Sequence, residues 1–170
     1  MRKSSHKHNV LQFRVAEEAL DEDGTFELEE KLFGEKISEL EQRLSYSDRL
    51  SRVFSIIQTD FRNPRLNLAH ASHMCGVEKS HLNALLHRSS GATFHQLLVR
   101  YRVLKGARLL REKNRTVLET AISCGFGSVR TSNRNFRRLL GCGPCRFRKV
   151  LQWRRKEETR IGAKWPHTDS

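Results

Sequence analysis

The amino-acid sequence predicts an all-α protein, in which two pairs of short helices flank one long helix. Three observations favour this fold class. From Leu50 onward, apolar residues recur at the three- and four-residue spacings of amphipathic helices, and no segment alternates convincingly as a strand would. Two Thr-x-x-(Gln/Glu) sequences, beginning at Thr93 and Thr116, are capping boxes that start helices. Glycines follow several of the apolar runs, at positions where a helix has to end.

Residues 1–45 form an acidic extension, with seven Lys and Arg against eleven Asp and Glu. Four apolar residues in it lie at alternating spacings of four and three: Phe33, Ile37, Leu40 and Leu44. This stripe predicts a linker helix or a short coiled-coil seam. Because it spans fewer heptads than an established coiled coil needs, a plain amphipathic helix is an equal alternative. We expect the extension to be partly helical and partly disordered.

Residues 46–150 are predicted to form one helical domain. Ser47 can cap its first helix, and Asn63-Pro64 ends that helix. One face of the helix carries its apolar residues, Leu50, Val53, Phe54, Ile57 and Phe61.

The first pair of short helices is expected at about residues 66–91. Asn67 can cap a helix that runs to about Met74, Gly76 supplies a turn, and a second helix runs from about Lys79 to a left-handed cap at Gly91. A short helix, a glycine-containing turn and another short helix make the helix-turn-helix pattern.

The long helix is expected at about residues 93–111, and a second helix-turn-helix at about residues 116–140. Gly125 breaks the second pair into two helices, and Gly141 ends it. Pro144 can take the first position of a last helix that holds Phe147 and Leu151.

The predicted fold is therefore all-α, with two helix-turn-helix subdomains joined by a long linker helix and preceded by the acidic extension. Residues 151–170 are predicted to be a polar carboxy-terminal tail, disordered from about Arg155.

The positive charge is concentrated after the extension. Residues 46–170 carry 25 Lys and Arg against eight Asp and Glu, which favours nucleic acid as the partner. A membrane surface is the alternative, but no isolated basic amphipathic segment calls for it. No apolar run is long enough to span a membrane, and the amino terminus lacks the apolar region of a signal peptide. We therefore expect a cytoplasmic protein whose cysteines are reduced.

A series of residues in the second half of the domain has a distinctive order and spacing. The series is Ala121, Gly125-Phe126, Arg134-Asn135-Phe136-Arg137, Gly141-Cys142-Gly143-Pro144 and Phe147-Arg148. The first half of the domain carries a second, looser series: Gly76-Val77, Leu82, Gly91, Arg102 and Leu109-Leu110. With these residues, the segment from about Asp48 to Arg148 resembles the DNA-binding domain of the AraC/XylS family of bacterial transcription regulators.

The resemblance implies a sequence-specific transcription regulator that inserts two recognition helices into successive major grooves, about 34 Å apart. The positions that match the family's base-reading residues are Lys79, Ser80, Asn83, Ala84, Val129, Arg130, Asn133 and Arg134. Among these, we expect direct contacts from Arg130, Arg134, Asn83 and Asn133, since Arg suits guanine and Asn suits adenine. Contacts to phosphates are expected from Arg88, Arg137, Arg138, Arg146 and Arg148. Residues 1–45 are too short for the sensing domain that family members commonly carry. We expect either a stand-alone DNA-binding unit with an acidic extension, or an extension that meets a regulatory partner or RNA polymerase.

Several residues depart from the family pattern. Ser132 stands where an aromatic residue or Leu usually anchors the core, and Ala84 occupies a position that often holds a long polar side chain. Ser72, Gly106 and Leu86 also differ from the usual residues. These departures favour, as the alternative, a degenerate regulator: a basic nucleic-acid or protein interaction module without strong sequence specificity.

Cys142-Gly143-Pro144-Cys145 has the spacing of a redox dithiol, which makes a thiol-disulfide oxidoreductase a remote alternative. In such enzymes the dithiol follows a strand, whereas here a predicted helix precedes it. Arg146 and a nearby helix terminus are expected to be able to lower the pKa of a thiol here.

Other chemistry has weaker support. His70, His73 and Cys75, with His81 nearby, make a zinc site conceivable, but paired Cys-x-x-Cys spacing is absent and exposed helix histidines are the better interpretation. The sequence has no phosphate-binding loop and no hydrolase or metalloprotease motif. We therefore expect no enzyme, no cofactor and no metal.

Overall fold

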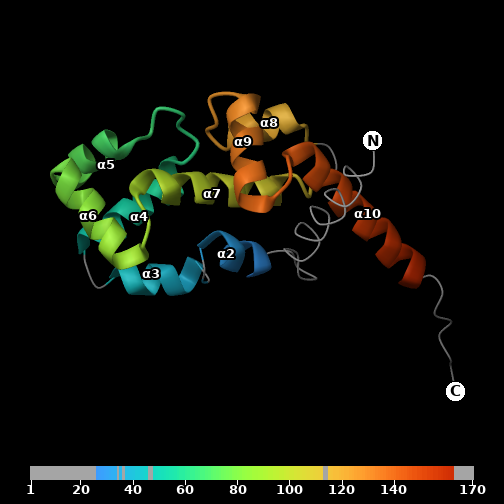
Figure 1. The fold of residues 1–170 in the computed structure, drawn as a ribbon, viewed down its shortest axis with the longest axis horizontal. Coiled ribbons are helices and arrows are strands. Elements are labelled where there is room, and N and C mark those ends of the chain that lie inside the picture. The colour runs from blue at the N-terminus through green and yellow to red at the C-terminus, as the bar shows by residue number, and fades with distance from the viewer. Residues whose placement is uncertain (1–25, 34, 36, 46–47, 113–114, 163–170) are drawn as a thin grey trace, which may run out of the picture.

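The computed structural model of the protein describes residues 26–33, 35, 37–45, 48–112 and 115–162, and every element in them is a helix (Figure 1). The all-α prediction is confirmed. The helices are α2 (Phe26–Phe33), α3 (Ile37–Ser45), α4 (Asp48–Asp60), α5 (Leu68–Cys75), α6 (Lys79–Ser90), α7 (Phe94–Leu109), α8 (Val117–Ser123), α9 (Val129–Leu140) and α10 (Pro144–Gly162).

Helix α7 is the central element, and the other helices are arranged around it (Figure 1). It begins at the expected capping box, where the backbone N–H of Gln96 donates to Oγ1 of Thr93 at 3.3 Å and the backbone N–H of Thr93 donates to Oε1 of Gln96 at 2.8 Å. Its side chains are buried on nearly every side, which is typical of a helix inside a core rather than on its surface.

Helices α5 and α6 form the first helix-turn-helix, at one end of α7. As predicted, the Asn67 side chain caps α5 by accepting from the backbone N–H of His70 at 3.0 Å. The left-handed cap of α5 lies at Gly76, with φ 62°, and that of α6 lies at Gly91, with φ 67°. Both glycines thus occupy the conformation that the sequence predicts for them.

Helices α8 and α9 form the second helix-turn-helix. The second capping box is present, with the backbone N–H of Thr116 donating to Oε2 of Glu119 at 2.8 Å and the return bond from Glu119 N–H to Oγ1 of Thr116 at 3.1 Å. The turn passes through Gly125, with φ 71°, and α9 ends at Gly141, with φ 74°. Pro144 is the first residue of α10, as expected.

The buried side chain of Arg102 ties α7 to the end of α4. Its Nε–H donates to the carbonyl oxygen of Phe61 at 2.8 Å, and Nη2 donates to that of Asn63 at 2.7 Å. The first bond gives the Phe61 carbonyl, just past the end of α4, its partner, and the second adds to the bond that the Asn63 carbonyl accepts from the backbone N–H of Leu66.

Helices α2 and α3 pack beneath α7 and α4, so residues 26–45 are part of the fold (Figure 1). Leu32 and Leu40 are buried in the common core. Glu29 accepts from the backbone N–H of Ile37 at 3.0 Å and forms an ion pair with Arg108 of α7. The stripe from Phe33 is therefore divided between two helices rather than forming one seam, and Gly34, between them, has low helix propensity. Residues 1–25, expected to be partly disordered, lie outside the described residues.

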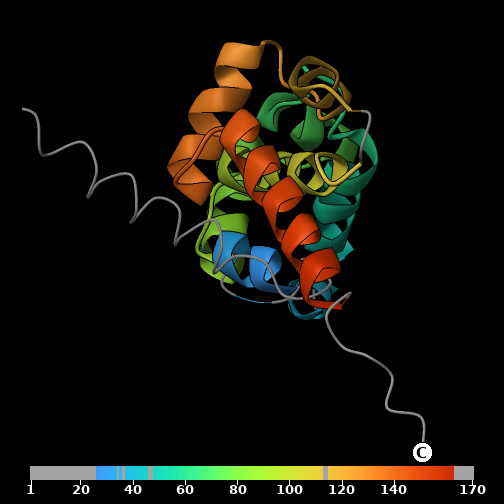
Figure 2. The same cartoon turned by 90° about the vertical axis from the view of Figure 1, so that its right-hand side faces the viewer.

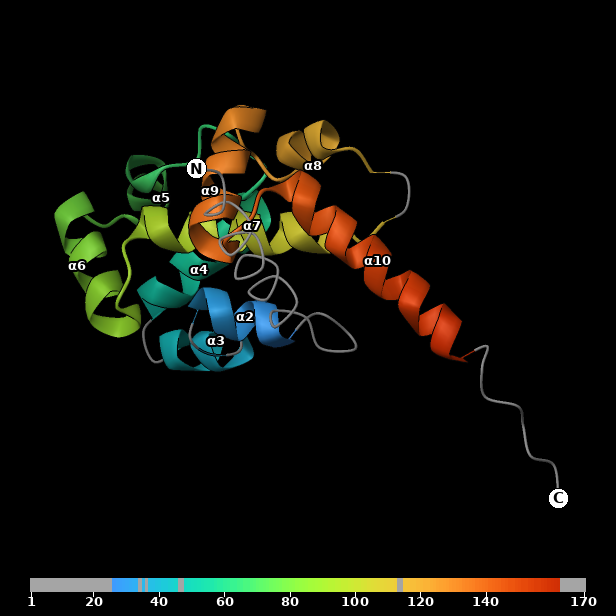
Figure 3. The ribbon, with the colours of Figure 1, turned by 45° about the vertical axis from the view of Figure 1, so that its right-hand side comes forward.

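Helix α10 is longer than predicted; it lies in front of the other helices in Figure 2, and Figure 3 shows it projecting from the body of the protein. The prediction of disorder from about Arg155 is wrong as far as Gly162. The segment between these residues contains no glycine or proline, so nothing in its composition ends the helix earlier. Among the described residues, no helix is both long and apolar enough to cross a membrane.

Candidate nucleic-acid interface

Helix α9 has one face in the core and one face open to solvent. Ser128 caps its amino terminus, accepting from the backbone N–H of Thr131 at 3.1 Å. The inner face buries Ser132, Asn135, Phe136 and Leu140. Arg130, Arg134 and Arg137 are exposed on the other face. Val129–Leu140 contains four arginines and no carboxylate, so the exposed face is positive throughout.

The predicted base-reading side chains of α9 lie together. Arg130, Asn133, Arg134 and Arg137, with Thr131, line one hollow of about 560 Å³. Val129 is different, because it is half-buried and packs against the core. The cluster presents both guanidinium groups, which suit guanine, and an amide, which suits adenine.

Helix α6 exposes Lys79, Ser80 and Ala84, but two of its polar side chains already have partners. The Asn83 side chain is half-buried, and its Oδ1 accepts from the backbone N–H of Phe94 at 3.4 Å. The hydroxyl of Ser80 donates to the carboxylate of Glu78, the residue that caps α6. This helix therefore offers fewer unengaged polar groups to a base than α9 does.

Glu78 places a negative charge at the amino terminus of α6. Its carboxylate accepts from the Ser80 hydroxyl and from the backbone N–H of His81, the latter at 3.0 Å. These bonds, the hydroxyl's first, lower its pKa from 4.5 to about 2. The group is ionised at neutral pH, where it stabilises the helix but opposes the approach of a phosphate.

The arginines predicted to contact phosphates do not share one environment. Arg88 and Arg137 are exposed. Arg138 is also exposed, and its Nη2 donates to Oδ1 of Asn135 on the same helix at 3.2 Å. Arg146 is half-buried.

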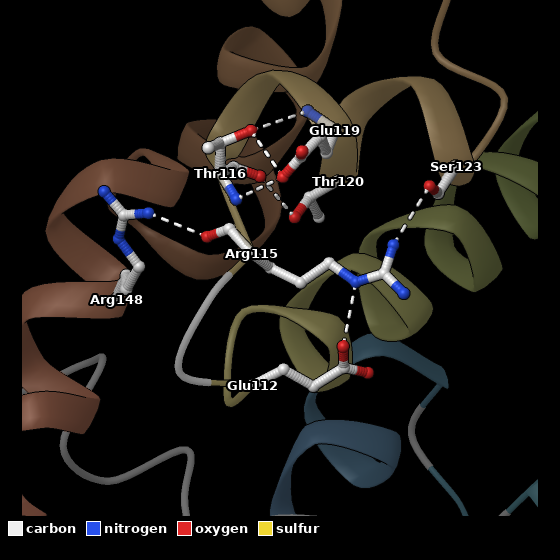
Figure 4. Close-up of polar contacts among 7 residues, drawn as sticks. All are labelled: Glu112, Arg115, Thr116, Glu119, Thr120, Ser123 and Arg148. Carbon is white, nitrogen blue, oxygen red and sulfur yellow. Dashed lines mark hydrogen bonds and ion pairs between the residues drawn. The ribbon is translucent and has the colours of Figure 1, made fainter.

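Arg148 has a partner within the fold (Figure 4). It is half-buried, and its Nη1 donates to the carbonyl oxygen of Arg115 at 2.8 Å, linking α10 to the segment before α8. One of the five N–H donors of this guanidinium is therefore used within the fold.

A second hollow, of about 430 Å³, lies where α7 meets α9 and its preceding turn. His95 of α7 lines it together with Thr131, Arg134 and Arg138 of α9. Neither His95 nor Thr131 was among the site residues predicted from the sequence. Nothing in the sequence distinguishes His95 from the other polar residues of α7, such as Gln96 and Arg100.

The core beneath α9 accommodates two departures from the family pattern. Ser132 is buried, as an anchor position requires, and the ring of Phe136 is fully buried nearby in the same helix. A Cβ on Gly106 would lie 3.0 Å from Cζ of Phe136. Because Gly106 has no side chain, the Phe136 ring can pack closely against the backbone of α7 at this position.

The cysteines are all free thiols. Burial raises the pKa of Cys142, and Arg146 offsets this only in part. The lowering expected from Arg146 is present at Cys142, but loss of solvation is larger and the net pKa is raised. Cys145 is exposed. A protonated, buried Cys142 opposes thiolate chemistry at the dithiol.

Histidine and cysteine side chains near α5 do not assemble a metal site in the part of the chain that the structure describes. No group of three or more His, Cys, Asp or Glu side chains is close enough there to hold a metal ion. His70 and His73 are exposed on α5, and Cys75 is half-buried.

Comparisons with known proteins point to one kind of domain. Residues 71–150 match a family model described as a helix-turn-helix domain. The probable transcription factor PqrA of Proteus vulgaris is 28% identical over 88 residues, which cover 52% of this chain and 72% of PqrA. The probable transcriptional regulator LumQ of Photobacterium leiognathi is 30% identical over 88 residues, covering 52% of this chain but only 36% of LumQ.

A solved structure gives the same result. The DNA-binding domain of AdpA, a global transcriptional factor crystallised in complex with a target DNA, is 26% identical with a TM-score of 0.61. The match covers 65% of this chain and 98% of that chain.

Proposed function

Because the chain belongs, through residues 71–150, to the AraC/XylS type of helix-turn-helix transcription regulators, we propose that it binds double-stranded DNA with α6 and α9 in successive major grooves. The family and fold are those of DNA-binding regulators and not of enzymes. AdpA supports the proposal because its similar domain was solved with DNA.

The single observation that carries the proposal is the solvent face of α9. Its arginines cluster around one hollow, on a helix that is rigidly held by its opposite, buried face. A helix of this kind fits the major groove, and its first turns reach base edges. The absence of carboxylates from Val129–Leu140 removes any repulsion by the helix itself toward phosphates.

Within this interface, we assign base reading mainly to α9. Arg130 and Arg134 suit guanine, and Asn133 suits adenine. Lys79 and Ala84 of α6 contribute a phosphate or base contact and an apolar contact, respectively. Ser80 and Asn83 take part only if they exchange their partners within the protein for bases.

We assign phosphate contacts to Arg88, Arg137, Arg138 and Arg146, which fix the register without reading sequence. Arg148 we assign to the fold, since its guanidinium already holds the backbone of Arg115.

Helix α7 sets the spacing of the two recognition helices. Its buried side chains and its bonds from Arg102 to the end of α4 hold both units in fixed positions. Two grooves on one face of B-DNA are about 34 Å apart, so a rigid connector favours a site with two parts.

A module without strong sequence specificity is the second candidate, and α6 is the observation that favours it. With Ala84 lacking a polar group and Ser80 and Asn83 engaged within the protein, the first helix has little with which to read bases. Phosphate contacts alone would then supply most of the affinity.

Selection from a random duplex library, followed by sequencing, separates the two candidates. The regulator predicts an enriched motif, bound at least about 10³-fold more tightly than random duplex at the same salt concentration. No enrichment would support the module instead. In the selected site, Arg134→Ala should relax the preference at one base pair, whereas Arg137→Ala, the matched control, should weaken selected and random duplexes alike.

A contact of residues 1–45 with RNA polymerase or a regulatory protein stays a prediction. Because α2 and α3 use Leu32 and Leu40 to cover the core of their own chain, such a partner would meet their outer, polar faces or residues 1–25.

A further inference from the structure

A basic cavity of about 350 Å³ lies apart from the two recognition helices. Its polar lining comes from the end of α4, the second half of α7, the segment before α8 and the end of α8. These lining residues are Arg62, Lys105, Arg108, Glu112, Arg115 and Ser123. None of the lining residues comes from α6 or α9, so the proposed DNA-reading surface does not account for the cavity.

The residues that line the cavity carry more positive than negative charge. Four cationic side chains line the cavity with one carboxylate, that of Glu112. Glu29 of α2 compensates Arg108 by an ion pair. No such carboxylate partner is found among the described residues for Arg62 or Lys105, whose cationic groups instead lie over the rings of Phe61 and Tyr101, at 5.5 Å and 5.1 Å.

The positive groups also act on one another. Burial lowers the pKa of Lys105, and the nearby charges of Arg108 and Arg62 lower it further, while the carboxylate of Glu29 offsets part of this effect. Cys124, fully buried close by, is in the field of Arg62, Arg115 and Lys105, although burial prevails and raises its pKa to about 12. An anion in the cavity would relieve this repulsion.

Arg115 is held in a definite orientation at the rim (Figure 4). Its Nε donates to Oε2 of Glu112 at 2.8 Å, and its Nη1 donates to Oγ of Ser123 at 3.3 Å. The remaining N–H donors of this guanidinium have no partner among the described residues. A fixed guanidinium with unused donors, beside a hydroxyl, is suited to the oxygens of a phosphate group.

We propose that this cavity is a binding site for a small anion that carries a phosphate group. The volume lies within the usual range of small-molecule sites, roughly 300–1,000 Å³. A phosphate bound between Lys105 and Arg62 on one side and Arg115 and Ser123 on the other joins α4, α7 and α8. Such a ligand stabilises the position of the second helix-turn-helix on the long helix, and thereby raises DNA affinity. Only this last step rests on the proposed function.

The binding step is tested on the full chain with inorganic pyrophosphate as the probe, by calorimetry and thermal unfolding at constant ionic strength. Arg62→Gln combined with Lys105→Gln removes two cavity charges whose side chains form no hydrogen bond with another described residue. Arg49→Gln combined with Arg52→Gln is the matched control, because both side chains are exposed on α4 outside the cavity. We expect saturable binding that the cavity variant weakens at least tenfold and the control does not.

Two results would overturn the site. One is the absence of saturable binding beyond that of chloride at equal ionic strength. The other is an equal loss of affinity in both double variants, which would mean that pyrophosphate responds only to net charge. Circular dichroism spectra of both variants identify any loss of folding, and Arg62→Lys with Lys105→Arg, which keeps the charges, should retain binding if the fold is intact.

DNA phosphates are the other source of the same chemistry, and a second arm distinguishes them. If the cavity held the DNA backbone, the cavity variant would reduce the salt dependence of DNA binding by about 0.9 in log–log slope for each DNA phosphate that it no longer neutralises. We expect that slope to stay unchanged, and pyrophosphate to tighten DNA binding by the wild type but not by the cavity variant. A reduced slope with competition by pyrophosphate would assign the cavity to DNA. Failure to bind any DNA would contradict the proposed function while leaving the pyrophosphate result to decide the site.

Discussion

The carbonyl oxygen of Phe61 lies 2.2 Å from the position that a Cβ on Gly125 would occupy. The turn of the second helix-turn-helix therefore rests directly on the end of α4. The same carbonyl accepts a hydrogen bond from Arg102 of the long helix at 2.8 Å. The peptide group of Phe61 thus contacts both the long helix α7 and the turn that precedes α9.

Gly125→Ala should destabilise the protein by about 3 kcal/mol or more. The substitution puts a side chain on a left-handed residue and forces its Cβ into the backbone at Phe61. Gly76→Ala is the matched control, because Gly76 has φ 62° but open space around its Cβ position, so only the strain of about 1–2 kcal/mol applies. Urea denaturation of both variants measures the difference. Equal losses would mean that the contact with Phe61 has no energetic effect.

Arg102→Leu should lower the free energy of unfolding by about 2–4 kcal/mol, because it leaves the carbonyl of Phe61 without its buried donor and removes one of the two donors to the carbonyl of Asn63. Arg65→Leu, at an exposed position of the following loop, should change it by less than about 0.5 kcal/mol. Arg102→Lys should restore little, since a single ammonium group cannot reproduce the fork of two bonds. Stability close to wild type in the lysine variant would contradict this interpretation.

Helix boundaries were the part of the fold most fully predictable from sequence, because the interactions that set them are local. The caps at Asn67, Thr93 and Thr116 bond to backbone groups three residues away, so they are visible in the sequence itself. Left-handed glycines at the helix ends are equally local.

Contacts between distant segments were not predictable in this way. The ion pair between Glu29 and Arg108 joins residues 79 positions apart, and it belongs to the packing that makes α2 and α3 part of the core. The bond from Arg148 to the backbone of Arg115 spans 33 positions and gives a partner within the fold to an arginine that the family resemblance assigned to a DNA phosphate. Nothing in the sequence places these partners together without the tertiary structure.

The predicted site residues also divide into those that the sequence identifies and those whose contacts depend on the tertiary structure. Arg130 and Arg134 were identified from their positions in the family motif, and both are exposed on α9 beside the same hollow. The engagement of Asn83 depends on the start of α7 eleven residues later, and the partner of Ser80 is a capping glutamate that the family pattern does not reveal.

Arg137→Gln and Arg148→Gln should have different effects on DNA binding. Removal of a phosphate contact by Arg137→Gln lowers the slope of log affinity against log salt by about 0.9. Arg148→Gln should leave the slope unchanged and reduce stability by about 1 kcal/mol, because its hydrogen bond is within the fold. Fluorescence anisotropy over a salt series makes the comparison. A reduced slope in the Arg148 variant would return that residue to the DNA interface.

Glu78 should make stability depend on pH in the acid range. Its pKa in the folded protein is about 2, against an ordinary value of 4.5, so its contribution is fully present above pH 4.5 and is lost as the pH falls toward 2. The difference in stability between the wild type and Glu78→Gln should therefore be constant above about pH 5 and shrink below it. Denaturation of both proteins at pH values between about 2 and 4.5, and again just above 4.5, measures this difference in stability.

Ser80→Ala removes the largest cause of that shift and should move the loss to higher pH. If the pH profile of Ser80→Ala coincides with that of the wild type, the hydroxyl is not what lowers the pKa of Glu78.

Methylation interference at guanine N7 on the selected DNA site shows whether one chain places α6 and α9 in two successive major grooves. We expect two groups of sensitive positions on one face of the duplex, separated by one helical turn of about 10 base pairs. Arg134→Ala should weaken only the group contacted by α9. A single group of sensitive positions, or none, would mean that the two helices do not occupy successive grooves.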